Sequence, residues 1–142
     1  MIRIATPADF EDILELYKAG LEELGFKYKE DLLKIKIVNS YKLAPCFLVV
    51  MNDKICGMAG FTVVTTSHDG VASLADYMFY IKPEHRNIKT LDALMKTIKE
   101  FAMTHGLPVR LDFFISKSLK SHKRLLERYG FKVSALLGVY NG

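Results

Sequence analysis

Apolar residues in the first forty positions recur at intervals of three, four and seven, which is the spacing of one face of an α-helix. The pattern predicts two helices joined by a short connection, one over residues 10–24 and one over residues 32–41. Gly25 offers a left-handed stop after the first helix, and Pro45 disfavours helix in the residue before it. A short strand over residues 2–5 is expected to precede the pair.

From residue 46 onward the apolar residues alternate with polar ones or form continuous runs, as is typical of strands. Strands are predicted over residues 46–51, 55–66 and 71–81. Because only short turns separate them, we expect an antiparallel meander. The third strand is apolar along nearly all of its length, so both of its faces are expected to be buried.

The last third of the chain alternates between helical and strand patterns. A helical stripe closed by Gly106 contains Leu91, Leu94, Met95, Ile98, Phe101 and Ala102. A strand over residues 109–115, a helix over 119–129 and a strand over 131–140 follow. Strands connected through helices usually pair in parallel. The predicted fold class is therefore α/β with a mixed sheet: strand, two helices, three-strand meander, helix, strand, helix, strand.

Composition narrows the class of protein. The 142 residues, 50% of them apolar and 25% charged, suit a single globular domain over residues 1–142. No segment offers the roughly 20 apolar residues of a spanning helix, and the N-terminal residues lack an export signal. We therefore expect a cytoplasmic protein without a membrane partner. The formal charge of +4 comes without a basic stripe interleaved with aromatic residues, which disfavours nucleic-acid binding.

The sulfur and imidazole side chains give no pattern of a metal site. Cys46 and Cys56 lie within apolar strands, where we expect them to be reduced and partly buried. The four histidines are spread over turns and a helix without the spacing of shared ligands. No bound metal is expected.

Two segments carry a resemblance to a known family. Residues 81–86, Ile-Lys-Pro-Glu-His-Arg, lead straight into the amphipathic helix, and residues 124–131, Arg-Leu-Leu-Glu-Arg-Tyr-Gly-Phe, close the next one. With the element order, these segments resemble the GNAT superfamily of N-acyltransferases over essentially the whole chain. The resemblance implies a splayed mixed sheet, acetyl-CoA as acyl donor, and a small-molecule or peptide amine as acceptor. It also implies that Phe79 and Ile81 serve the pantetheine arm of acetyl-CoA.

The start of the amphipathic helix is the candidate site for the diphosphate of acetyl-CoA. Free N–H groups and the helix dipole favour a diphosphate at such a position, which here comprises Arg86, Asn87, Ile88, Lys89, Thr90 and Leu91. In the family pattern, glycine stands where this chain has Lys89, and glycine or alanine where it has Leu91. A cation from Lys89 or Arg86 can compensate. Two functions therefore stay open: an N-acetyltransferase, or a binding or regulatory protein that has kept the fold and lost cofactor binding.

Asp76 is the candidate general base, because a carboxylate within an apolar strand is expected to have a raised pKa. The alternative is a carboxylate that only accepts hydrogen bonds from a neighbouring loop. Many family members have, where this chain has Leu126, a tyrosine that acts as the general acid, so the usual general acid is missing here. Tyr129 is expected to pack against the core. The last strand offers an edge on which two copies can pair, which leaves a homodimer open.

Overall fold

The computed structural model describes residues 1–112 and 119–133. The strands are β1 (Ile2–Ile4), β2 (Cys46–Met51), β3 (Lys54–Thr65), β4 (Ala72–Ile81) and β5 (Val109–Arg110), and the helices are α1 (Phe10–Leu24), α2 (Glu30–Tyr41), α3 (Ile88–His105) and α4 (Leu119–Arg128). Two short 3-10 helices, Pro7–Asp9 and Pro83–His85, precede α1 and α3. None of the described helices is both long and apolar enough to cross a membrane.

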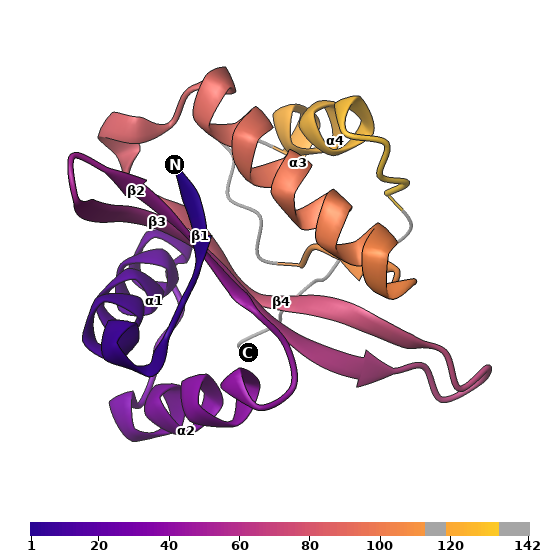
Figure 1. Cartoon of the computed structure of the whole chain (residues 1–142), viewed down its shortest axis with the longest axis horizontal. Coiled ribbons are helices and arrows are strands. Elements are labelled where there is room, and N and C mark those ends of the chain that lie inside the picture. The colour runs from indigo at the N-terminus through magenta and orange to yellow at the C-terminus, as the bar shows by residue number, and fades with distance from the viewer. Residues whose placement is uncertain (113–118, 134–142) are drawn as a thin grey trace, which may run out of the picture.

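The described residues form one five-stranded sheet through the centre of the molecule, in the order β1-β2-β3-β4-β5. The first four strands pair antiparallel, and β5 pairs parallel to β4. Helices α1 and α2 cover one face of the sheet, and α3 and α4 cover the other (Figure 1). The predicted α/β fold with a mixed sheet is confirmed.

The two helix-ending glycines act as the sequence predicts, whereas the late strands are shorter than predicted among the described residues. Gly25 and Gly106 end α1 and α3 with φ angles of 77° and 63°, in the left-handed region that favours glycine. The predicted strand over 109–115 is regular only at Val109 and Arg110 among its described residues. Of the predicted strand over 131–140, residues 131–133 have no regular structure and the remainder lies outside the described residues.

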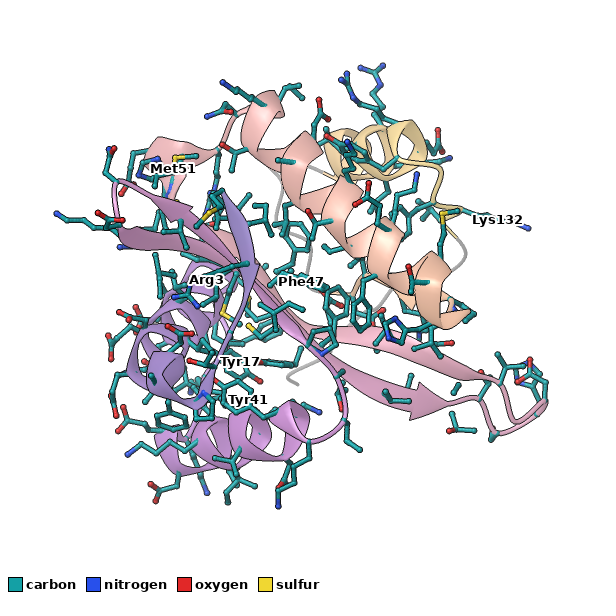
Figure 2. The ribbon with its side chains drawn as sticks, in the orientation of Figure 1. Arg3, Tyr17, Tyr41, Phe47, Met51 and Lys132 are labelled. Atoms are coloured by element: carbon teal, nitrogen blue, oxygen red, sulfur yellow. The ribbon has the colours of Figure 1, made fainter. Side chains whose placement is uncertain are left out.

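Each face of the sheet has its own hydrophobic core. The α3 side contains Phe47, Val49, Phe61, Leu74, Phe79, Ile81, Leu94, Met95 and Ile98, among others. The α1 side contains Ile13, Tyr17, Leu33, Ile37, Leu48, Met58, Tyr77, Met78 and Tyr80, among others. Figure 2 shows Phe47 on the side of α3 and Tyr17 and Tyr41 on the side of α1 and α2. As predicted, nearly every residue of β4 is buried.

A β-bulge at Tyr77 interrupts the alternation of β4. Gly60 of β3 pairs with Met78, whereas the next residue, Phe61, pairs with Asp76. Tyr77 and Met78 therefore both belong to the core on the α1 side. Leu74 before the bulge and Phe79 after it belong to the opposite core. The bulge thus places Asp76, by alternation with Leu74, on the same face of the sheet as Phe79.

Candidate functional site

The edge of β4 that faces away from β3 is the centre of the candidate site. Over the described residues, β5 pairs with this edge only at Leu74 and Ala75. Farther along, the N–H of Lys82 donates to the carbonyl of Cys56 on β3. Because peptide groups alternate along a strand, those of Phe79 and Ile81 are directed away from β3. The two residues predicted to serve pantetheine therefore present backbone groups along one edge.

Asp76 directly follows Ala75, the last residue of β4 that pairs with β5 among the described residues. Its side chain is buried, and its Oδ1 accepts a hydrogen bond of 2.6 Å from the backbone N–H of Asp112, just beyond β5. The contact ties the end of β5 to β4. It corresponds to the alternative role considered for Asp76, a carboxylate that satisfies a neighbouring loop. Its role as a general base stays a prediction.

The edge of β4 leads through a short loop to the start of α3. Asn87 is the N-cap of this helix, and its side-chain oxygen accepts a bond of 2.9 Å from the N–H of Thr90. Among the described residues, the backbone N–H groups of Ile88 and Lys89 have no acceptor. Two donors thus remain for an anion at the positive end of the helix dipole.

The side chains at the two glycine positions of the family pattern differ in their surroundings. Lys89 is exposed, and none of the ion pairs between described residues includes it. Leu91 is partly buried and packs against the core on the α3 side. The extra volume at Leu91 is therefore absorbed by the core, and the charge at Lys89 stays in solvent beside the two free donors.

Arg86, the other candidate cation, already has several partners. Its Nε donates to the carbonyl of Ile81 at 2.6 Å, and its Nη2 donates to Glu23 of α1 at 2.8 Å. Its guanidinium also lies over the ring of Tyr80, 5.2 Å from the centroid. These contacts hold the Arg86 charge at the end of α1.

The closing helix supplies no acid at the family's position. Leu126 is buried in the core on the α3 side. Tyr129 packs against the same core, as predicted, but its hydroxyl also donates to Asp92 of α3. Burial, reinforced by Asp92, raises the pKa of Tyr129 to about 12. A hydroxyl that holds its proton so firmly is a poor proton donor to a thiolate.

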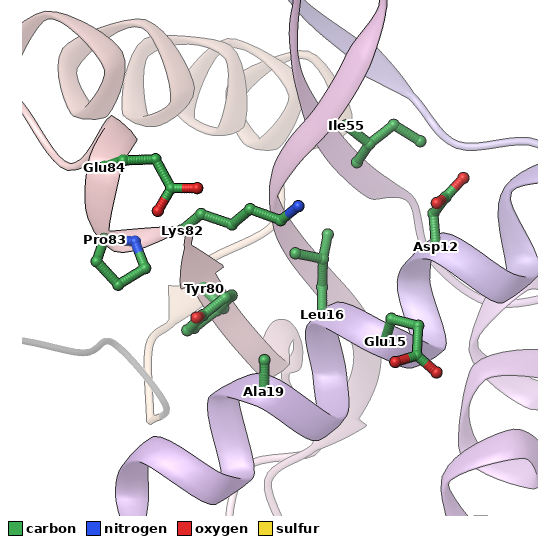
Figure 3. A pocket seen from close by; sticks show the side chains of 9 residues that line it. All are labelled: Asp12, Glu15, Leu16, Ala19, Ile55, Tyr80, Lys82, Pro83 and Glu84. Atoms are coloured by element: carbon green, nitrogen blue, oxygen red, sulfur yellow. The ribbon is translucent and has the colours of Figure 1, made fainter.

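A pocket of about 380 Å³ lies on the α1 side of the same loop. Its lining residues are Asp12, Glu15, Leu16, Ala19, Ile55, Tyr80, Lys82, Pro83 and Glu84, and Figure 3 shows the Lys82 side chain extending across it. Tyr80 and Lys82 alternate along the chain with Phe79 and Ile81. The pocket therefore lies on the face of the sheet opposite to the side chains of Phe79 and Ile81.

Sequence patterns did not indicate the bulge at Tyr77, the partner of Arg86 at Glu23, or the partner of Tyr129 at Asp92. The last two pairs are separated by 63 and 37 residues, and no local signal marks them. Cys46 and Cys56 are free thiols, as expected, but both are fully buried rather than partly buried. In the described part of the chain, no cluster of three potential metal ligands is present.

Comparison with known proteins gives a consistent fold. A predicted acetyltransferase from Clostridium acetobutylicum, solved with acetyl-CoA, has a TM-score of 0.78 at 15% identity and covers 99% of this chain and 95% of its own. A ribosomal-protein-alanine N-acetyltransferase from Brucella melitensis gives 0.71 at 12%, with 100% and 99% covered. An aminoglycoside acetyltransferase from an uncultured soil sample gives 0.70 at 12%, with 100% and 97% covered.

Structural likeness at such low identity establishes the fold alone. No curated protein sequence matches the chain. The sequence model of the Acetyltransferase (GNAT) family, however, matches residues 10–131, which include α1, the whole meander, the helix start at Ile88 and α4. The chain belongs to the GNAT family of acetyltransferases.

Proposed function

We propose that the protein is an N-acetyltransferase that moves the acetyl group of acetyl-CoA to a primary amine. One observation carries the proposal: the outward edge of β4 runs into a helix start with two backbone donors that lack an acceptor among the described residues. The pantetheine arm of acetyl-CoA is an extended chain with two amides, which suits a strand edge. The diphosphate to which it is joined suits a helix start with free N–H groups.

Binding of the donor rests on backbone groups. The peptide group of Phe79 and the N–H of Ile81, whose carbonyl accepts from Arg86, bond the pantetheine amides. The N–H groups of Ile88 and Lys89 bond the diphosphate. The Lys89 ammonium adds a charge-assisted contact. The family's glycines permit close backbone approach. In this chain, the packing of Leu91 into the core and the exposure of Lys89 support a cradle that is reshaped rather than closed.

The reaction needs little covalent chemistry from the protein. The amine lone pair attacks the thioester carbonyl, a C–N bond forms, and the C–S bond breaks with release of the CoA thiolate. The proton lost by the amine passes to Asp76, directly or through water. The thiolate is protonated by water, because Leu126 is apolar and Tyr129 is bonded to Asp92. The protein therefore contributes mainly orientation of the two reactants.

The chemical class of the acceptor is a primary amine, and its size is left open. Two of the structural neighbours are named for their acceptors, one a ribosomal-protein-alanine N-acetyltransferase and the other an aminoglycoside acetyltransferase. Acceptors as different as these are served by one fold, which means that loops and side chains select them.

Calorimetric titration with acetyl-CoA tests the proposal. We expect the original chain to bind, and Lys89→Gln to bind about tenfold more weakly, because it loses one charge-assisted contact. Lys96→Gln is the matched control, since Lys96 is an exposed lysine of the same helix two turns farther on. Absence of binding at millimolar acetyl-CoA would show that the proposal is wrong.

A second function is supported by the side chains that replace the family's pattern. Side chains occupy both glycine positions of the family pattern, with Leu91 packed against the core, and the buried Leu126 stands at the position of the family's acid, so the site lacks several features of the family's enzymes. These features suit a protein that binds without catalysis. Release of free thiol from acetyl-CoA in the presence of a panel of amines separates the two functions, because only an acetyltransferase produces CoA.

A further inference from the structure

Arg86 connects three parts of the molecule that are distant in sequence. Its Nε bonds the carbonyl of Ile81 at the end of β4, and its Nη2 bonds Glu23 in the last turn of α1. The guanidinium covers the ring of Tyr80. Both charged side chains are about one-third exposed, at 32% for Arg86 and 34% for Glu23, so the pair is neither buried nor freely solvated.

The contact with Ile81 closes the loop between β4 and α3. Ile81 is the last residue of β4, and Arg86 directly precedes the Asn87 cap of α3. A side chain that fixes the distance between these two points also fixes where the free N–H groups of Ile88 and Lys89 lie relative to the strand end. Glu23 belongs to α1, on the face of the sheet opposite to α3, and it accepts a hydrogen bond from the Arg86 side chain.

The geometry requires a forked donor. Two nitrogens of one planar guanidinium reach a carbonyl and a carboxylate at once, whereas a lysine ammonium is a single point charge on a flexible stem. With its donors directed to Ile81 and Glu23, the Arg86 side chain stays on the α1 side of the loop. A diphosphate at the start of α3 would meet the backbone that Arg86 holds.

We propose, on the basis of the function proposed above, that Arg86 and Glu23 are positioning residues that set the helix start of α3 for diphosphate binding without touching the diphosphate. If Glu23 instead acted on the diphosphate directly through its charge, its effect on binding would be unfavourable. A carboxylate near a polyanion repels it, so removing that charge would strengthen binding. Positioning depends on the length and hydrogen-bonding capacity of the side chain, and much less on its charge.

Two matched substitutions of Glu23 separate these effects in calorimetric titrations with acetyl-CoA. Glu23→Asp keeps the charge and shortens the side chain, and we expect it to weaken binding about 3- to 10-fold; Arg86→Lys should do the same. Glu23→Gln keeps the length and an acceptor oxygen, and we expect affinity within about twofold of the original. Glu22→Asp is the control, because this neighbouring carboxylate bonds Tyr28 instead.

Melting temperatures are recorded alongside, and titrations are made where every variant is folded. A role in stability alone would lower the melting temperature and leave the dissociation constant unchanged, which overturns the proposal. Tighter binding of acetyl-CoA by Glu23→Gln also overturns the proposal, because it would show that the Glu23 charge repels the diphosphate. If the original chain fails to bind, the proposed function falls, and this inference with it. If the original chain binds and Glu23→Asp binds equally well, the inference alone is wrong.

Discussion

At the scale of single residues, Asp9 at the start of α1 shows how several partners fix one carboxylate. It accepts two bonds from the Arg3 guanidinium, at 2.8 and 2.9 Å, and one from the N–H of Thr6 at 2.8 Å. These bonds favour the charged form and outweigh burial, so the pKa of Asp9 falls to about 2, with the Arg3 hydrogen bond as the largest cause. The pair ties β1 to the entrance of α1.

Stability should therefore depend on pH through Asp9. Because its folded pKa lies below that of the unfolded chain, the contribution is complete above about pH 4 and is lost as the pH falls toward 2. We expect Asp9→Asn to lower the free energy of unfolding by about 2 kcal/mol at pH 7 and by much less at pH 2.5. Urea unfolding at both pH values measures this, and Glu11→Gln, an exposed neighbour, should show no such difference.

Gly60 matters because of the space it leaves. A methyl group on this residue would overlap the ring of Tyr77, which is buried and packs on Tyr17 with ring centroids 5.1 Å apart. We expect Gly60→Ala to cost about 1–3 kcal/mol, the usual penalty of overpacking a core.

Chemical denaturation of Gly60→Ala, Tyr77→Ala and the double variant tests this cause. Removal of the ring opens the space that the methyl group needs, so the two costs should be less than additive. Strict additivity would mean that the methyl group is destabilising for a reason other than the Tyr77 ring.

At the scale of elements, α3 joins the candidate site to the closing helix. Asp92, one turn after the helix start, accepts the hydroxyl of Tyr129, and Lys99 donates to the Tyr129 carbonyl at 2.9 Å. Arg128 adds an ion pair with Asp92 at 3.7 Å. Helix α4 is therefore docked by polar contacts at its end as well as by the burial of Leu126.

Tyr129→Phe removes the hydroxyl and keeps the ring. We expect a loss of about 1–2 kcal/mol at pH 8, the usual size for a hydrogen bond to a charged group at a partly exposed site. Because the folded pKa of Tyr129 is raised to about 12, its contribution is complete below about pH 10 and is lost as the pH rises toward 12. The difference between the two proteins in urea unfolding should shrink from pH 8 to pH 11. An unchanged difference would contradict the role given to the hydroxyl.

At the scale of the whole molecule, two cores share one sheet. Phe47 and Val49 of β2 face the α3 side, and Leu48 between them faces the α1 side. Neither core can form without the strands that also build the other. The described part of the chain should therefore unfold as one cooperative unit.

Ile37 and Ile98 test this coupling, since both are fully buried, one in each core. We expect Ile37→Ala and Ile98→Ala each to cost about 2–5 kcal/mol, as is usual for such truncations. In both variants, far-ultraviolet and tyrosine near-ultraviolet circular dichroism should report one common midpoint. Separate midpoints for the two signals in either variant would show that the cores unfold independently.

The sequence by itself determined the order of the elements from the first strand to the closing helix and the faces that they bury. The spacing of apolar residues is a local property, and Gly25, Gly106 and Pro83 end their elements for reasons of their own backbone geometry. The helix start after Arg86 and the candidate residues of β4 could therefore be located in advance.

Only the tertiary structure decided what those residues contact. The bulge at Tyr77 depends on a glycine in the neighbouring strand, and it sets the face on which Asp76 lies. Arg86 was predicted as a cation for the diphosphate, yet its donors go to Ile81 and to Glu23, 63 residues away. The periodicity of apolar residues indicates which side chains are buried. A hydrogen bond between distant residues, however, depends on how two segments pack together, and the sequence pattern of neither segment predicts that.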